Sequence, residues 1–397
     1  MSKSGFWKIG LVTGEYPPME GGVGAFTQEL AKALDALGHE VFIISSRASK
    51  PTDRSYSVRE LNRPIDLGYA KLIARGRRWA WNDMHMVADV AIREELDIVN
   101  LQYQPAAYNM RIPAMNFLPW RMTGVAKTVV TFHDLRVPYL FPKAGPLRQW
   151  VVKLMARNAE GVIVTNREDY ATIRDQWSVN SKVQQIPIGS NIDVHDVSAE
   201  TIHQTRASLN VTDTDILLGY FGFLNDSKGA DTLIDALAQL PKNYHLVFIG
   251  GQTGASDPTN NSAFLNAIRS QITDYGLQER VHWTGFVDDA QVSAYLKSAD
   301  MITLPYKDGV SLRRGTLMAT LAHGCPLITT HGDPELQHEE NCWLIEAGNS
   351  ADLSQAVQSL TNDNIRRERI GRNAQMLAQS FTWDKIAQQT LSLYAQL

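Results

Sequence analysis

The sequence predicts an α/β protein of two domains, each built on a parallel sheet, and three observations carry this prediction. Strand-like and helix-like patterns alternate from residue 8 to 165, and the alternation starts again at residue 216. At 397 residues the chain exceeds the length that one hydrophobic core usually serves. The restart follows the segment 186–189. We therefore predict domains over 1–190 and 191–382.

In the first half, short apolar runs predict buried strands, and apolar residues spaced by three or four predict a helix that ends at Gly38. In chain order these segments are strand 8–13, helix 26–37, and strands 41–45, 98–101, 128–132 and 161–165.

The second half repeats the pattern around an Asn/Gly/Ser-rich loop at 250–262. Its segments are strand 216–221, helix 230–240, strand 245–249, a helix ending near 276, strand 281–284, helix 291–299, and strands 301–304 and 327–330. The last segment, 383–397, has helical spacing. We expect it to pack back on the first domain, although it could also cover its own sheet.

Composition excludes several classes of protein. Apolar residues make up 44% of the chain and charged residues 20%, as in ordinary globular proteins. No apolar run approaches the length of a membrane-spanning helix, and the N-terminal apolar stretch is too short for a secretory signal. Cys325 and Cys342 provide neither a disulfide framework nor metal-ligand spacing. We expect a cytoplasmic protein.

The charge is unevenly distributed along the chain. Residues 1–190 contain 24 Lys+Arg and 18 Asp+Glu, a net of +6, whereas residues 191–397 contain 14 and 24, a net of −10. This asymmetry indicates a first domain that meets an anionic partner, or else two unrelated surfaces.

In the first domain, a glycine-rich turn at 14–24 follows the first strand. Gly21 and Gly22 would bring backbone N–H groups close to a ligand at the carboxyl edge of the sheet, unless the turn is only a flexible connection. The spacing is not that of a dinucleotide-binding fingerprint, whose third glycine would fall on Thr27. His133 and Asp134 follow strand 128–132 at the same edge. This imidazole could donate to a sugar hydroxyl or to developing charge, or could be structural.

In the second domain, Lys228 lies between a strand and a helix N-terminus, which favours a phosphate ligand over a plain surface lysine. The acidic pairs Asp213/Asp215 and Asp288/Asp289 are more typical of caps and turns than of metal ligands. The sequence contains no Walker motif, zinc-ligand spacing or nucleophile elbow.

A second phosphate-site pattern lies at 308–326, where a polar loop leads into an apolar segment that ends at Gly324 and Pro326. Free N–H groups at the start of such a helix could hold a diphosphate, and Arg313 and Arg314 add positive charge beside it. An ordinary surface loop before a sheet-packing helix is the alternative.

These motifs together resemble the retaining glycosyltransferases of family 4. The resemblance covers nearly the whole chain. It implies the GT-B architecture, two facing Rossmann-like domains with an interdomain cleft. It is carried by Pro18-x-x-Gly21-Gly22, Gly38-His39-x-Val41, His133-Asp134, Ile186-Pro187-x-Gly189-x-x-Ile192-Asp193, Lys228-Gly229, Gly285-Phe286-Val287-Asp288, Ala322-His323-Gly324-Cys325-Pro326 and Phe381-x-Trp383.

The resemblance implies a role for each matched residue. Lys228 and a helix starting near Ser311 would hold the donor diphosphate, the base would rest against the Phe286-Val287 backbone, and His133 would contact the transferred sugar. The expected donor-binding residues are Gly21, Gly22, Gly222, Phe286, Val287, Ser311, Leu312 and Gly315, beside His133, Lys228, Arg313 and Arg314 as catalytic residues and Glu15 and Asp134 as acceptor residues.

The chain departs from the family pattern at three positions. The family's two glutamates before its A-x-G-x-P element fall on Ser311 and Ala319, and its arginine five positions before the lysine falls on Phe223. We predict that Arg313 or Arg314 replaces the lost positive charge, with Arg314 slightly favoured.

By this resemblance the protein is expected to move a hexose from a nucleoside diphosphate sugar, with UDP as the favoured nucleotide, to an acceptor hydroxyl in polysaccharide or glycolipid synthesis. No metal, other cofactor or nucleic acid is expected. A non-catalytic sugar-nucleotide-binding protein and a nucleotide-sugar epimerase are the alternatives. The basic, aromatic segment 71–81 suits peripheral contact with the inner membrane face or an anionic acceptor, unless it is a solvated helix with buried tryptophans.

Overall fold

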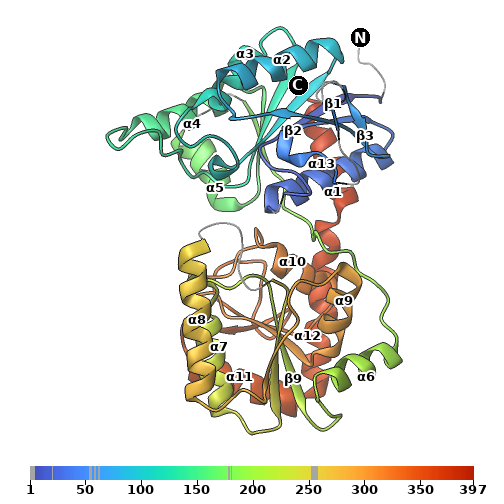
Figure 1. Cartoon of the computed structure of the whole chain (residues 1–397), viewed down its shortest axis with the longest axis vertical. Helices are drawn as coiled ribbons and strands as arrows, with labels where there is room; N and C mark the ends of the chain where they lie inside the picture. The colour runs from blue at the N-terminus through green and yellow to red at the C-terminus, as the bar shows by residue number, and fades with distance from the viewer. Residues whose placement is uncertain are drawn as a thin grey trace. The chain divides into compact units, whose positions relative to one another are not determined.

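The computed structural model consists of two compact units (Figure 1). It describes residues 5–19, 21–52, 56–57, 60, 63–177, 179, 181–251 and 258–397. The first unit comprises Met1–Gly189 together with Trp383–Leu397, and the second comprises Ser190–Thr382. Both are α/β units built on a parallel sheet, as the alternating pattern predicts.

The first unit contains a sheet in the order β3-β4-β2-β1-β5-β6-β7-β8, parallel except for the β3–β4 pair. Its strands are β1 Lys8–Thr13, β2 Glu40–Ser46, β3 Ile65–Asp66, β4 Lys71–Gly76, β5 Ile98–Tyr103, β6 Lys127–Phe132, β7 Gly161–Val164 and β8 Lys182–Gln185. Its helices are α1 Gly22–Ala36, α2 Trp81–Arg93, α3 Leu118–Arg121, α4 Leu147–Asn158, α5 Arg167–Ala171 and α13 Trp383–Tyr394. The strand order reverses between β1 and β5, and such a switch point is where open α/β sheets bind ligands.

Every residue of β5 is buried, because helices cover both faces of the sheet. Along β1, Leu11 contributes to one core cluster and Val12 to the other, so the two clusters lie on opposite faces. One cluster includes Val87 of α2 and Met155 of α4.

The C-terminal helix α13 packs on α1 within the first unit (Figure 1). Asn100 lies at the centre of the sheet. Its side-chain Nδ2 donates to Tyr394 Oη at 2.7 Å, and its side-chain Oδ1 accepts from Thr131 Oγ1 at 2.9 Å. Trp383 meets Phe26 edge-on, with ring centroids 5.1 Å apart. The last fifteen residues therefore complete the core of the unit that the first residues began.

The second unit contains a fully parallel sheet in the order β11-β10-β9-β12-β13-β14, with its switch point between β9 and β12. Its strands are β9 Ile216–Phe221, β10 Tyr244–Ile249, β11 Val281–Trp283, β12 Met301–Leu304, β13 Leu327–Thr330 and β14 Trp343–Ile345. Its helices are α6 Ala199–Ser208, α7 Ala230–Gln239, α8 Pro258–Asp274, α9 Asp289–Ser298, α10 Gly315–Ala322, α11 Ser350–Asn362 and α12 Asn364–Ala378.

Two segment assignments need correction, and a third lies partly beyond the described residues. Residues 71–81 are not a helix: β4 ends at Gly76, a loop follows, and α2 begins at Trp81. Leu72 and Trp79 are buried and Trp81 is exposed, which breaks the segment as a single basic face. The helix expected near Ser311 begins at residue 315. Residues 252–257 of the predicted loop 250–262 lie outside the described residues, and α8 begins at 258.

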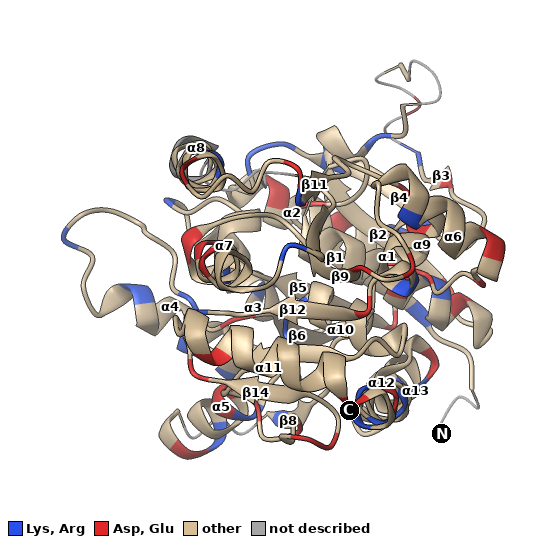
Figure 2. Ribbon diagram, turned by 90° about the horizontal axis from the view of Figure 1, so that it is seen from below, with Lys and Arg blue, Asp and Glu red and all other residues tan. Residues whose placement is uncertain are grey.

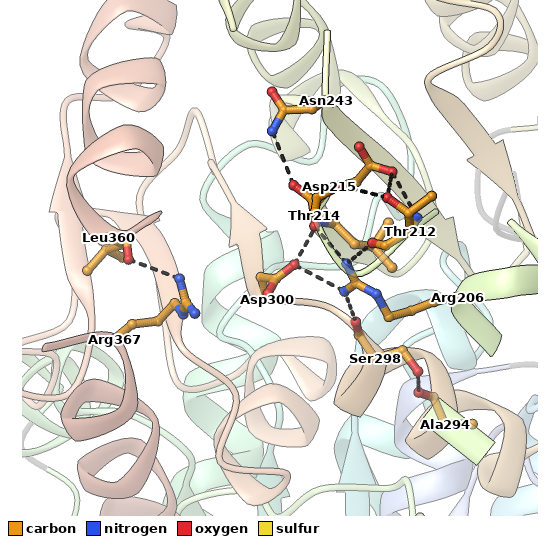
Figure 3. Close-up of polar contacts among 11 residues, drawn as sticks. Arg206, Thr212, Thr214, Asp215, Asn243, Ala294, Ser298, Asp300, Leu360 and Arg367 are labelled. Atoms are coloured by element: carbon orange, nitrogen blue, oxygen red, sulfur yellow. Dashed lines mark hydrogen bonds and ion pairs between the residues drawn. The ribbon is translucent and has the colours of Figure 1, made fainter. Parts of the chain in front are cut away.

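A polar network ties the elements of the second unit together at the amino ends of β9 and β12 (Figure 3). Arg206 of α6 donates to the Ser298 carbonyl at 3.0 Å, to Asp300 Oδ2 at 3.1 Å and to the carbonyls of Thr212 and Asp215 at 3.1 and 2.7 Å. Asp300 Oδ2 also accepts from the Leu217 amide at 2.8 Å. The network lies at the edge opposite the strands' carboxyl ends, so we assign it to stability.

We expect Arg206→Ala to lower the free energy of unfolding by about 2–3 kcal/mol, because it removes four hydrogen bonds and leaves the Asp300 carboxylate without its cation. The measurement is the midpoint of unfolding in urea. Arg367→Ala is the matched control, because Arg367 donates to the Leu360 carbonyl at 3.2 Å (Figure 3). This substitution should lower the free energy of unfolding by about 1 kcal/mol or less. Equal midpoints for the two variants would contradict the assignment.

Candidate active site

Two glycines bring together the loops that follow β9 and β12 in the second unit. Gly229 has φ +70°, and a Cβ there would lie 2.0 Å from the Pro305 carbonyl oxygen. Gly222 has φ +124°, and a Cβ there would lie 2.7 Å from Thr316 Cγ2. Only glycine permits both the backbone conformation and the close approach. The two loops can therefore meet at the switch point of the sheet.

Lys228, Tyr306 and Arg314 converge at this point. The Lys228 Nζ lies 5.0 Å from the centroid of the Tyr306 ring, and the Arg314 Cζ lies 4.0 Å from the same centroid. The ring is buried, and its hydroxyl lies 3.0 Å from Thr316 Oγ1 in the first turn of α10. Tyr306 thus holds two cations against one aromatic ring.

The cations of this cluster outnumber its anions. Burial, and then the charge of Arg314, lower the pKa of Lys228 to about 8. Within the described part of the chain, Lys228 Nζ has no hydrogen-bond or ion-pair partner, and the buried Nε of Arg314 has no acceptor. Arg314 Nη2 donates to Asp308 Oδ1 at 2.5 Å and to the Gly309 carbonyl at 3.3 Å. The cluster therefore fits an anionic ligand.

Helix α10 begins about one turn later than expected, at Gly315 and not near Ser311, and the expected phosphate site moves with it. The Leu312 amide donates to Asp333 Oδ2 at 3.2 Å and the Arg314 amide to the Ser311 carbonyl at 3.1 Å, so these groups are not free. The helix begins at Gly315, next to Arg314, and its first turn carries no side-chain cap. The unsatisfied amides of a helix start belong to residues 315–317, beside the cation cluster.

The remaining residues expected in the second unit lie either around the start of α10 or after β11. Gly315 is confined by Asn191, whose Oδ1 would lie 2.9 Å from a Cβ there. Phe286 is 85% exposed and Val287 half-buried, after the carboxyl end of β11. They share the sheet edge with Lys228 but lie on the far side of β10 from β9. Arg313 is exposed, and its Nε lies 3.4 Å from Ser311 Oγ.

In the glycine-rich loop of the first unit, two backbone amides at the start of α1 are already bound by a carboxylate of the protein itself. Glu15 Oε1 accepts from the amides of Val23 at 3.0 Å and Gly24 at 3.4 Å. A Cβ at Gly21 would lie 2.1 Å from this carboxylate oxygen, so only glycine leaves room for the Glu15 side chain at that position. A Cβ at Gly22 would meet no atom within 4 Å. Burial raises the pKa of Glu15, and the two amides oppose the rise. The protein's own carboxylate therefore fills the anion position at the start of α1.

His133 and Asp134 follow β6 in the first unit. His133 Nε2 donates to Gln102 Oε1 at 3.1 Å, and its ring meets Phe26 edge-on, with centroids 4.7 Å apart. Burial lowers the pKa of His133 to about 4, so the imidazole is neutral near pH 7. Asp134 accepts from the Gln104 side chain at 3.4 Å and from the Arg136 amide at 3.1 Å.

Sequence reasoning missed three residues of these edges: Gln102, Tyr306 and Asp308. The Gln102 Nε2 is buried without an acceptor among the described residues, next to His133. Gln102 and Tyr306 occupy the ends of β5 and β12 at the two switch points, and that position in the sequence could have identified them.

The acidic pairs behave as caps and turns. Asp215 Oδ2 accepts from the Thr212 amide at 2.8 Å, and Asp288 caps α9 by accepting from the Gln291 amide at 2.8 Å. Among the described residues, no group of three or more His, Cys, Asp or Glu could hold a metal ion. None of the helices in the described part of the chain is long and apolar enough to cross a membrane.

The two parallel-sheet units, with their loops at the switch points, have the architecture of the GT-B fold, and two family models identify the class as a glycosyltransferase. The model of glycosyltransferase family 4 matches residues 20–194, and that of the group 1 glycosyl transferases matches residues 201–376. The chain belongs to glycosyltransferase family 4, which confirms the resemblance seen in its motifs.

Curated relatives and solved structures agree with this class. The phosphatidyl-myo-inositol mannosyltransferase of Mycobacterium leprae is 24% identical over 98% of this chain and 96% of its own. The alpha-monoglucosyldiacylglycerol synthase of Streptococcus pneumoniae is 24% identical over 83% and 72%. Anabaena HepE in complex with UDP has a similar fold, with a TM-score of 0.75, 20% identity and coverage of 98% and 100%. Sucrose-phosphate synthase from Thermosynechococcus elongatus also has a similar fold, with a TM-score of 0.74, 21% sequence identity and coverage of 98% of both chains.

Proposed function

We propose that this glycosyltransferase moves a hexose from a UDP-sugar to an acceptor hydroxyl, with retention at the anomeric carbon and without a metal ion. One observation carries the proposal: Lys228 and Arg314 flank Tyr306 beside the open first turn of α10, and among the residues that the structure describes only Asp308 is their counter-ion. A diphosphate would supply the missing negative charge. The solved complex of HepE with UDP supports the choice of nucleotide.

In the proposed reaction the second unit stabilises the leaving group, the nucleoside diphosphate. The bond from the anomeric carbon to the phosphate oxygen breaks as the bond to the acceptor oxygen forms. The acceptor's proton passes to the departing phosphate oxygen on the same face of the sugar. Negative charge grows on the diphosphate during this step, and Lys228, Arg314 and the amides of α10 are preorganised to meet it.

In the first unit, neutral His133 would act on the transferred sugar, with Gln102 holding its ring. Glu15 and Asp134 are the proposed acceptor contacts. The names of the relatives in M. leprae and S. pneumoniae point to lipid-linked acceptors, so a glycolipid is the preferred acceptor class within the proposal.

The test is a binding and product assay. Purified protein is screened by thermal shift against UDP-, GDP- and ADP-hexoses, and the best donor is then incubated with glycolipid acceptors, with and without EDTA. We expect a UDP-sugar to bind and an α-linked product from an α-linked donor to form in EDTA. Donor binding with neither transfer nor hydrolysis would instead identify a binding protein. Release of an altered free sugar in the absence of an acceptor would identify an epimerase. Loss of turnover in EDTA, restored by Mg²⁺, would reject the metal-free route.

The affinity for UDP should depend on pH through Lys228. Its folded-state pKa is about 8, so the ammonium is present below pH 8 and is lost as the pH rises through that value. Above it, binding must take up a proton, and the affinity should fall by up to about tenfold for each pH unit. Calorimetry near pH 8.5, in two buffers of different ionisation enthalpy, measures this uptake. Lys228→Arg stays charged and should abolish it, whereas equal uptake in that variant would assign the titration to another group.

A further inference from the structure

An aromatic and basic surface lies on the first unit and begins at the residue after Asp134. It comprises residues 77–81, 109–121 and 135–150 and is called here the α4 surface. Five of its aromatic side chains are between 44% and 61% exposed. They are Trp81, Trp120, Tyr139, Phe141 and Trp150. Tryptophan side chains exposed to this extent mark an interaction site when they gather on one face.

Ring contacts and a cation–π contact link several side chains of the α4 surface. Phe117 bridges Trp81 and Trp150, with ring centroids 5.5 Å and 6.4 Å away. Arg148 lies over the Tyr139 ring at 4.9 Å and donates to the Phe141 carbonyl at 2.9 Å.

Backbone contacts join the loops of the patch. The Leu140 amide donates to the Met110 carbonyl at 2.6 Å, and Asn109 Nδ2 donates to the Arg78 carbonyl at 2.9 Å. Helices α2, α3 and α4 pack together beneath them. Figure 1 shows the chain before α4 projecting from the body of its unit.

The charge of this surface is strongly positive. Its three segments contain seven Lys+Arg and no acidic residue, and the neighbouring Asp134 pairs with Arg136 at 4.0 Å. Arg77, Arg78, Arg111, Arg136 and Lys143 are exposed. Figure 2 shows basic positions on the projecting loop that leads into α4.

The fold holds two of these arginines outward. The buried Asp83 carboxylate accepts from the amides of Arg77 at 3.1 Å, Arg78 at 3.2 Å and Ala80 at 3.1 Å. These three bonds fix the backbone of the loop while both arginine side chains remain exposed. The positive face is therefore held in place before any partner binds.

We propose that the α4 surface docks the protein on an anionic lipid bilayer. Tryptophan and tyrosine favour the membrane–water interface, and basic residues among them are attracted to anionic headgroups. The core of a protein interface is depleted of charged residues, whereas here cations are interspersed with the aromatics. The surface begins directly after His133 and Asp134, so docking would bring lipid-borne hydroxyls toward that edge of the sheet. Lipid binding itself stands apart from the proposed transfer, because it needs no donor.

Co-sedimentation with vesicles tests the proposal. The full chain is mixed with phosphatidylcholine vesicles that contain either no anionic lipid or about 30 mol% phosphatidylglycerol. We expect binding to the anionic vesicles alone, lost in about 0.5 M NaCl. Arg136→Ser/Lys143→Ser should weaken it by roughly tenfold or more, at about fivefold for each cation. Trp120→Ser/Trp150→Ser should also weaken it and should abolish the blue shift of tryptophan fluorescence.

The matched control is Ile365→Ser/Met376→Ser, which removes two exposed apolar side chains, 80% and 59% exposed, from α12 of the second unit. It should sediment as the unmodified protein does, and all variants should retain the thermal shift with the donor. No binding to anionic vesicles, or equal binding by the surface variants, would overturn the proposal. Binding to dextran sulfate but not to vesicles would assign the surface to an anionic glycan. Tryptophan-dependent dimerisation without lipid binding would assign it to a second copy of the chain.

Discussion

Replacing Lys228 or Arg314 by alanine should weaken the binding of UDP by about tenfold to a hundredfold, because each change removes a charged hydrogen bond worth about 1.5–3 kcal/mol. Uridine, which lacks the diphosphate, should bind within about twofold of its normal affinity. Turnover with a UDP-sugar should fall further still, since the leaving diphosphate carries more negative charge in the transition state than in the donor. Calorimetry with UDP and with uridine separates the two contributions.

Arg313→Ala is the internal control for this result. Arg313 is the same residue type one position earlier, but it is exposed, whereas the side chain of Arg314 is 16% exposed and lies over Tyr306. We expect Arg313→Ala to change UDP affinity by less than about threefold. Removal of Arg314 also leaves Asp308 without its cation, so Arg314→Lys is included to restore the charge without the planar stack. Similar losses for Arg313→Ala and Arg314→Ala would refute the assignment of the diphosphate to this cluster.

The second large effect is expected at His133. His133→Ala should lower kcat at saturating donor and acceptor by roughly a hundredfold, since the ring nitrogen that is not bonded to Gln102 is preorganised to accept a hydrogen bond from the transferred sugar, and a preorganised polar contact of this kind contributes about that much. UDP binding should stay within about twofold, because the proposed diphosphate site belongs to the second unit. With a pKa of about 4, the imidazole stays neutral above pH 5, so the rate should show no titration of His133 between pH 5 and 8.

Two comparisons separate a catalytic His133 from a structural one. The imidazole packs edge-on against Phe26, so its loss could lower stability as well as activity. The melting temperature of His133→Ala therefore accompanies the kinetics, and His133→Asn, which keeps a side-chain hydrogen-bond acceptor, should recover part of kcat. A normal kcat in His133→Ala at saturation, even with a lowered melting temperature, would make the residue structural.

The strands of both sheets could be predicted closely, because buried parallel strands leave uninterrupted apolar runs. β1 and β9 occupy residues 8–13 and 216–221, as the pattern indicates. Strands at the edge of the first sheet, or next to it, escaped prediction for the converse reason. β8 has no fully buried residue, and the apolar residues of β4 lie among Lys71 and Arg75. Charged or exposed residues in such strands interrupt the apolar run by which a buried strand is recognised.

The candidate site shows the limit of sequence reasoning most clearly. The sequence by itself determined the two α/β units, the order of the family motifs, and the presence of Lys228 and two adjacent arginines near one sheet edge. It favoured Arg314 over Arg313 only slightly, because neighbours of one type differ only in where the backbone points them. The end of β12 decided between them by placing the Tyr306 ring beside Arg314.

Only the tertiary structure revealed that Glu15 fills the glycine-rich loop. The sequence shows glycines that would admit an anion, and the fold brings a carboxylate from eight residues before Val23 into that place. Local sequence thus determined which groups are available and which backbone shapes are allowed. Long-range packing decided which groups meet, because charge pairing and burial depend on distances that residue spacing does not specify.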